Sequence, residues 1–401
     1  MNEANGPCRA LVLGVHSRTS NPIFSEYEKE IRRRCEFSEY VNYRDTHLRV
    51  GAQHFEQYVR SLVREQRVNH IFVIFAGWDY LLRLEFLLDL SRIAKIVLFN
   101  FDTEYYFENL DRYYGQVADL VVLTDVISRG GYEELSIPAF TSYSLYDAQD
   151  RYPKLGGVAK SIDVSFIGNL AVGDRREHVE FLQASGVQVR AFGMGTEGGV
   201  VSQSEVVEIH NRSKICLNFT GTQDFSNMPP GIPRIRKRIR QAKGRPIEVA
   251  LCGSFLLSQF APGISSMFEI GRHCDVFESK EEMLEKVNYY LTHDEKREGM
   301  AALAHRFALE NYDIRPGFDK IFAAIEQARR RSDDLFVDKP FLAEHALAHF
   351  EVALHHFARG RLAIGWEELA IARRCRALSL VRLLERVKLY TRHKARRRVR
   401  S

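Results

Sequence analysis

The segment from Lys243 to Leu257 carries the clearest chemical pattern in the chain. It reads Lys-Gly-Arg-Pro-Ile-Glu-Val-Ala-Leu-Cys-Gly-Ser-Phe-Leu-Leu. Pro246 suits the first position of a helix and Gly253 the position after its last turn, so we expect a short helix followed by an apolar strand. Lys243 and Arg245 would then lie beside unpaired backbone N–H groups at the positive end of a helix, where phosphate binds readily.

Glu248 falls in the first turn of the same predicted helix. A carboxylate next to an anion site suits a ligand that carries both phosphates and neutral hydroxyls, as a nucleotide-linked sugar does. The alternative is a glutamate that only stabilises the start of its own helix. Ser254, directly after Gly253, could add a hydroxyl to the same site.

Further candidates for this ligand lie in loops that follow two other predicted strands. Gly168 and Asn169 end an apolar segment, and Arg175 and Arg176 open the helical segment after them. Close approach of this backbone to phosphate is one interpretation, and a surface turn with a helix start is the other. Asn218 ends a second apolar strand, where it could face the sugar or simply form a turn.

The elements that must position these residues alternate between apolar strands and helical segments. Apolar runs at residues 9–15, 70–76, 95–101 and 118–124 are each followed by a loop. This alternation predicts a parallel sheet covered on both faces, with functional groups in loops at the carboxyl ends of the strands. Those loops hold four candidate side chains, which are His16, Asp79, Asp102 and Asp125.

The alternation is interrupted by a polar, turn-rich stretch near residues 147–161 and restarts at Asp163. We therefore predict an α/β protein with two doubly wound, Rossmann-like domains that face a cleft, at residues 1–150 and 151–332. Residues 333–401 form a third region with long helices. Ala and Leu at helical spacing on both sides of Gly360 predict an antiparallel helical hairpin, which would cap the second domain or offer a surface to a partner.

Composition agrees with a globular protein of this size. The chain has 401 residues, 45% of them hydrophobic and 27% charged, and its longest apolar runs are far shorter than the ~20 residues that span a bilayer. The N-terminus shows no signal peptide, so we expect a cytoplasmic protein. Its six cysteines form no C-x-x-C pair, which predicts reduced thiols, with neither a disulfide framework nor a zinc site.

Positive charge is concentrated at the C-terminal end. Residues 341–401 hold 14 Lys and Arg against 5 Asp and Glu, whereas the whole chain has a net charge of +5. Leucines and arginines on opposite faces of the segment from Leu380 onward suit an anionic membrane surface, and a solvated terminus is the alternative. The basic run at residues 234–240 could bind nucleic acid or a membrane, and a loop over a diphosphate is an equal alternative. The run contains no aromatic residue to stack on bases, so a solvated helix face is favoured over nucleic-acid binding.

Taken together, five segments resemble the C-terminal domain of GT-B fold glycosyltransferases, in particular the CgeB-like (spore maturation protein-like) family related to group-1 glycosyltransferases. The resemblance covers roughly residues 160–325. The matching segments are Asp163–Asn169, Arg175–Glu177, Ser213–Asn218, Lys243–Gly253 and Glu281–Leu291.

The resemblance implies transfer of a sugar from a nucleotide diphosphate donor held mainly by the C-terminal domain, with no essential bound metal and no further cofactor. Glu248 stands in the position that resembles the ribose-binding glutamate of the group-1 enzymes. The residue eight positions earlier, a glutamate in those enzymes, is Arg240 here. This departure leaves the stereochemical outcome open.

The acceptor hydroxyl would need a general base, and Asp102 and His16 are the leading candidates because both lie in strand-end loops. For Asp102 the alternative is a helix N-cap. His345 and His349 are spaced like metal ligands, but no third ligand accompanies them, and packing within the hairpin is the favoured interpretation.

The function predicted from the sequence is transfer of a sugar from a nucleotide diphosphate sugar to a hydroxyl of a glycan or lipid-linked acceptor. The basic C-terminus is a candidate for peripheral contact with an anionic membrane. Two alternatives remain open at this point. One is a catalytically silent scaffold that binds nucleotide or glycan, and the other is a nucleotide-sugar epimerase on the same fold.

Overall fold

A computed structural model describes residues 6–15, 22–75, 79–221, 240–330 and 334–376, and Leu383. The chain divides into two compact units. Unit 1 comprises residues 1–122, 131–140 and 325–401, and unit 2 comprises residues 123–130 and 141–324. His16, the basic run up to residue 239 and the C-terminal tail after residue 376, Leu383 excepted, lie outside the described residues.

The six-stranded sheet of the N-terminal part has the strand order β2-β1-β3-β4-β5-β6. The pairs β1–β2, β1–β3 and β3–β4 are parallel. Every residue of β3 is buried, as expected for a parallel strand covered on both faces. The strands are β1 (Arg9–Gly14), β2 (Phe37–Asn42), β3 (His70–Ile74), β4 (Lys95–Asn100), β5 (Leu120–Leu123) and β6 (Ala139–Thr141).

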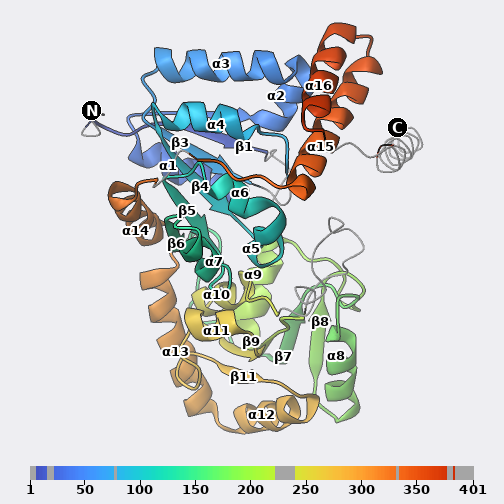
Figure 1. Ribbon diagram of the computed structural model, residues 1–401. Coiled ribbons are helices and arrows are strands. Elements are labelled where there is room, and N and C mark those ends of the chain that lie inside the picture. The colour runs from blue at the N-terminus through green and yellow to red at the C-terminus, as the bar shows by residue number, and fades with distance from the viewer. Residues whose placement is uncertain are drawn as a thin grey trace. The chain divides into compact units, whose positions relative to one another are not determined.

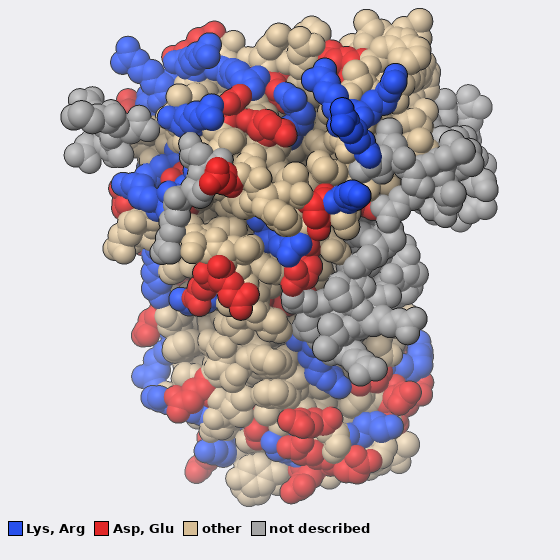
Figure 2. Space-filling model, viewed as in Figure 1, with Lys and Arg blue, Asp and Glu red and all other residues tan. Residues whose placement is uncertain are grey.

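Helices connect these strands. They are α1 (Pro22–Arg34), α2 (Tyr43–Val50), α3 (Ala52–Glu65), α4 (Leu84–Ser91), α5 (Thr103–Tyr106), the π-helix η1 (Phe107–Asp111), α6 (Arg112–Gly115) and α7 (Arg129–Glu134). On the face drawn in Figure 2, Lys and Arg side chains alternate with Asp and Glu over α3 and α4. Ion pairs such as Arg60–Asp89 (3.2 Å) and Arg92–Asp89 (3.2 Å) neutralise this surface locally.

Unit 2 contains a five-stranded sheet in the order β11-β10-β9-β7-β8, and all of its neighbouring strands are parallel. Its core packs apolar side chains of the strands, such as Phe166, Leu217 and Leu257, against the helices. The strands are β7 (Ile162–Ile167), β8 (Val189–Phe192), β9 (Ser213–Asn218), β10 (Phe255–Gln259) and β11 (Asp275–Phe277). The helices are α8 (Arg175–Ala184), α9 (Gln203–Arg212), α10 (Arg245–Leu251), α11 (Pro262–Met267), α12 (Lys280–Thr292), α13 (Asp294–Asn311) and α14 (Ile314–Gln327).

The two sheets share one doubly wound topology. Numbered from its own first strand, each has the order 2-1-3-4-5, with a sixth strand added in the first sheet. In such a sheet the strand order reverses beside the first strand, and ligands bind at the carboxyl ends of the strands near that reversal. The predicted α/β class with two doubly wound units is confirmed.

The C-terminal hairpin is also confirmed, but the prediction that it caps the second domain is wrong. Helices α15 (Lys339–Phe357) and α16 (Leu362–Arg374) lie side by side next to α2 (Figure 1). Helix α3 begins after Gly51 without a side-chain N-cap. Instead, the backbone N–H groups of Ala52 and Gln53 donate to the carboxylates of Glu368 (2.5 Å) and Glu367 (2.8 Å) on α16. The hairpin therefore completes unit 1.

The compact units do not follow the predicted boundaries at residues 150 and 332. The turn-rich stretch predicted as a linker packs within unit 2, where the carbonyl of Pro153 accepts a hydrogen bond from Asn211 (3.0 Å). In the last turn of α14 the chain returns to unit 1, where Lys95 donates to the carbonyl of Ile325 (2.8 Å). These contacts join residues far apart in sequence, so composition alone did not indicate them.

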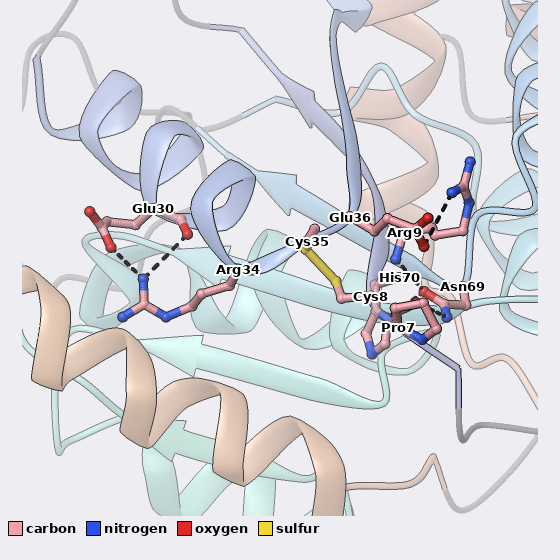
Figure 3. The surroundings of a disulfide bond; sticks show 9 residues. All are labelled: Pro7, Cys8, Arg9, Glu30, Arg34, Cys35, Glu36, Asn69 and His70. Atoms are coloured by element: carbon pink, nitrogen blue, oxygen red, sulfur yellow. Dashed lines mark hydrogen bonds and ion pairs between the residues drawn. A yellow bond between two sulfur atoms is a disulfide. The ribbon is translucent and has the colours of Figure 1, made fainter.

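The prediction of reduced thiols is wrong for Cys8 and Cys35, which form a disulfide with 4.5 Å between their Cα atoms (Figure 3). The bond joins the start of β1 to the end of α1. The two cysteines come together because β1 and β2 pair in parallel, and the N–H of Glu36 donates to the carbonyl of Cys8 (2.7 Å). A cross-link over such a loop stabilises a fold by about 3 kcal/mol. The remaining thiols, Cys216, Cys252, Cys274 and Cys375, are free.

No helix in the described part of the chain is long and apolar enough to cross a membrane.

Candidate functional site

A pocket of about 220 Å³ lies in unit 2, where β7 and β9 end and α10 begins. This is the edge of a doubly wound sheet at which ligands bind. Its apolar and glycine lining consists of Phe166, Ile167, Gly168, Phe219, Gly221 and Gly244. Its polar lining consists of Arg175, Asn218, Thr220, Gln241, Lys243, Arg245 and Glu248. Three cations and one carboxylate therefore share a single pocket.

Arg245 is the central cation of this pocket. Its Nη1 lies 2.5 Å from Oε2 of Glu248 and 3.2 Å from Nε2 of His210. Burial alone would lower the pKa of Arg245, but the Glu248 carboxylate and the nearby Tyr152 and Tyr146 outweigh it, so that pKa is raised. The guanidinium therefore stays charged at the wall of the pocket.

Glu248 is held between two partners. Besides the contact with Arg245, its Oε1 accepts a hydrogen bond from the Tyr146 hydroxyl (3.3 Å), and its side chain is 12% exposed. Tyr146 passes so close to the start of α10 that a Cβ on Gly244 would lie 1.9 Å from the Tyr146 oxygen. Glycine at position 244 therefore allows the tyrosine to reach Glu248.

The backbone N–H groups at the start of helix α10 contribute less to the pocket than the side chains of Lys243 and Arg245 do. The helix has seven residues, and the N–H groups of Ile247 and Glu248 already donate to the carbonyl of Gly244 (3.0 Å each). Because these two N–H groups donate within the helix, fewer backbone N–H groups are available to a ligand than the sequence predicted. The cationic side chains carry the positive charge of the pocket.

Of the two adjacent arginines on α8, Arg175 lines the pocket and Arg176 does not. Arg176 pairs with Glu180 (3.7 Å) and donates to the carbonyl of Gly195 (3.5 Å). Arg175 donates to the carbonyl of Asn169 (3.3 Å), and burial together with the charge of Arg245 lowers the pKa of Arg175. Of the two arginines considered at the start of this helix, the pocket therefore includes Arg175 and not Arg176.

The structure separates the remaining donor-side candidates. Gly168, Asn218 and the exposed Lys243 line the pocket. Asn169 and Ser254 are not among the residues that line it. The Asn169 carboxamide oxygen accepts from the N–H of Ala171 (2.9 Å), which is turn chemistry. Ser254 is buried, and its hydroxyl donates to the carbonyl of His210 (2.5 Å), so it acts beneath the pocket.

The general-base candidates lie at strand ends of the first sheet or outside the described residues. His16 is outside them. Asp102 precedes α5 in a left-handed conformation (φ 58°), and its side chain makes no capping hydrogen bond to that helix. Asp79 is buried, pairs with Arg44 (3.0 Å) and accepts from the N–H of Leu81 (2.9 Å), which is a structural role.

Asp125 follows β5, and its Oδ1 accepts from the N–H of Ser128 (2.7 Å), so it stabilises a turn. His345 and His349 are buried, and their Nδ1 atoms contact the Tyr80 carbonyl (2.5 Å) and the Glu368 carboxylate (2.5 Å). These contacts make the pair part of the packing of the hairpin. Across the described ranges, no three His, Cys, Asp or Glu side chains are grouped so as to hold a metal ion.

Sequence reasoning missed four residues at or beneath the pocket, which are Tyr146, His210, Thr220 and Gln241. Thr220 could have been found, because it comes two residues after the end of β9. Gln241 reaches the pocket because its N–H donates to the carbonyl of Thr220 (3.0 Å), which joins chain segments on both sides of the basic run. Tyr146 and His210 contact the site only through the tertiary fold.

Comparison with known proteins agrees with this geometry. Residues 175–323 match a family model described as glycosyl transferase-like, a segment that runs from α8 through most of α14. Among curated protein sequences, none matches the chain.

Several solved structures share the fold. Anabaena HepE in complex with UDP is 11% identical, with 80% of this chain and all of that chain covered and a TM-score of 0.55. The same protein with UDP-glucose is 13% identical, with coverage of 79% and 99% and a TM-score of 0.51. Sucrose-phosphate synthase from Thermosynechococcus elongatus is 9% identical, with coverage of 80% and 98% and a TM-score of 0.53.

The chain has the GT-B fold of these structures. Its fold and the glycosyl transferase-like segment, which contains α10 and most of the lining of the pocket, together support a GT-B glycosyltransferase. The narrower CgeB-like assignment stays a prediction.

Proposed function

We propose that this protein transfers a sugar from a nucleoside diphosphate sugar, held in the pocket of unit 2, to a hydroxyl of a glycan or lipid-linked acceptor. The observation that carries the proposal is the grouping of Arg175, Lys243 and Arg245 with Glu248 around one pocket. Cations match a diphosphate, and a carboxylate that accepts hydrogen bonds matches the neutral hydroxyls of ribose.

In this proposal the cations act on the leaving group. Negative charge develops on the nucleoside diphosphate as the bond to the sugar breaks, and fixed guanidinium and ammonium groups stabilise that charge. Arg245 and Lys243 would thereby supply what a bound divalent metal supplies in other enzymes. Asp102 or His16 would take the proton from the acceptor hydroxyl.

Uridine nucleotides are the first donors to test, because Anabaena HepE was solved with UDP and with UDP-glucose. We expect one nucleotide diphosphate from a panel to raise the apparent melting temperature of the wild type, since a ligand at 100 times its Kd adds about 2.7 kcal/mol. Arg175→Ala should abolish most of the shift, whereas Arg176→Ala, one residue away and outside the pocket, should keep it. Adding EDTA should leave the shift unchanged.

The same measurements separate the proposal from its alternatives. If no nucleotide shifts the melting temperature, or if both arginine variants behave alike, the donor site is assigned wrongly. Nucleotide binding without turnover of any donor indicates a silent scaffold. An epimerised nucleotide sugar that accumulates without acceptor indicates an epimerase.

The proposed lipid-linked acceptor would place the protein at a membrane surface, and the basic C-terminus is the candidate contact because residues 341–401 carry a net charge of +9. We expect the full chain to sediment with vesicles that contain anionic lipid and to be released by salt. A variant shortened after Arg376 should remain in the supernatant. Equal binding by the two proteins would remove the tail from the proposal.

A further inference from the structure

His210 lies directly beneath the pocket, at the end of α9, and is 1% exposed. Its Nε2 is 3.2 Å from Nη1 of Arg245. A guanidinium can only donate hydrogen bonds, so Nε2 must be the acceptor, and the neutral ring carries its proton on Nδ1. Burial and the positive charges of Arg245 and Lys160 agree with this form, since they lower the pKa of His210 well below 6.5.

Neighbouring side chains hold the backbone of His210 in place, whereas Nδ1 of its ring is buried without a hydrogen-bond partner among the described residues. The Ser254 hydroxyl donates to its backbone carbonyl (2.5 Å), and Lys160 donates in turn to the Ser254 oxygen (2.8 Å). At its other end, α9 begins with a capping box between Ser202 and Glu205. The imidazole is thus attached to a helix that is held at both ends.

The two partners of Arg245 differ in charge. Glu248 holds the guanidinium and also neutralises it, so while that ion pair persists it weakens attraction to a phosphate. His210 holds the same guanidinium with a neutral acceptor, which leaves its charge available. A ligand whose hydroxyls engage Glu248 would leave His210 as the fixed support of Arg245.

We propose that His210 is a positioning residue, whose neutral imidazole holds the Arg245 guanidinium toward the diphosphate of the donor. This inference rests on the proposed function. It also gives Ser254 and Lys160 a role, since they keep the histidine backbone in place. His210 itself touches no reacting atom and acts through Arg245.

The test replaces His210 and measures affinity for UDP, or for whichever nucleotide diphosphate stabilises the wild type. His210→Phe keeps an aromatic ring but removes the acceptor, and we expect binding to weaken about 10- to 100-fold, as for loss of a hydrogen bond to a charged group. His210→Gln restores an acceptor and should recover most of the affinity. His273→Phe, a buried histidine that stacks on Phe307 outside the pocket, is the matched control and should bind normally.

A double-mutant cycle with Arg245→Gln separates positioning from a general structural role. In the Arg245→Gln background, His210→Phe should have almost no further effect on affinity. If it weakens binding equally in both backgrounds, or if His210→Gln is as poor as His210→Phe, the positioning role is refuted. His210→Leu serves the same cycle should the phenylalanine variant fail to fold. Absence of nucleotide binding by the wild type would instead overturn the proposed function, and this inference with it.

Discussion

Arg245→Ala is expected to lower kcat for sugar transfer by about 100- to 1,000-fold, the usual effect of removing one fixed group that stabilises transition-state charge. The position of Arg245 is defined by two contacts, because both Glu248 and His210 accept from Nη1 of its guanidinium. The measurement is the initial rate of nucleotide release with the nucleotide sugar that stabilises the wild type most. A variant that turns over at the wild-type rate would disprove the role of Arg245.

The decrease in kcat must be distinguished from unfolding, since Arg245→Ala also leaves the nearly buried Glu248 carboxylate without its ion-pair partner. Arg245→Lys keeps a positive charge but lacks the planar fork, so it should retain part of the activity and most of the stability. Arg176→Ala removes a neighbouring arginine outside the pocket and should leave kcat unchanged. Melting temperatures of all three variants show whether the rates refer to folded protein.

The parts of this site that the sequence predicted are local in the chain. Helix α10 and strand β10 lie where Pro246 and Gly253 predicted them, because proline fixes the first turn and Gly253 adopts the left-handed conformation (φ 68°) that ends it. Likewise, buried parallel strands form continuous apolar runs, so most of them could be recognised individually. The exceptions are the short strand β6 and the half-buried β2.

What the sequence could not decide was the direction of individual side chains. Arg175 and Arg176 differ by about 100° around a helix, and only the packing of α8 determines which of them faces the pocket. Ser254 looked like a ligand contact because it follows the motif directly. In the structure the fold turns its hydroxyl toward His210 instead.

Contacts between segments far apart in the chain could not be predicted from the sequence either. The disulfide links residues separated by 27 positions, and the capping of α3 by α16 joins residues more than 300 positions apart. Periodicity indicates which face of a helix is apolar but not which element covers it. The hairpin was therefore recognised correctly and assigned to the wrong neighbour.

Glu368→Ala is expected to destabilise the docking of this hairpin by about 3–5 kcal/mol, because it leaves two buried donors without an acceptor. Glu368 is fully buried. Its two carboxylate oxygens accept from the N–H of Ala52 (2.5 Å) and from Nδ1 of His349 (2.5 Å). Hydrogen exchange of the α15 and α16 amides measures the effect, since it reports the free energy of local opening in a chain with two units.

Glu367→Ala is the matched control, because the hydrogen bond that Glu367 accepts from the adjacent N–H of Gln53 (2.8 Å) is exposed to solvent. It should cost less than about 1 kcal/mol. Equal losses in the two variants would mean that burial of Glu368 does not matter.

A pH series adds an independent check. Burial and the charge of Arg83 lower the pKa of His349 to about 4, below its ordinary 6.5, so the unfolded state binds the proton more strongly. The contribution of His349 to docking should therefore be largest above pH 6.5 and weaken as the pH falls toward 4, while burial raises the pKa of Glu368, which acts in the opposite direction at the acid end.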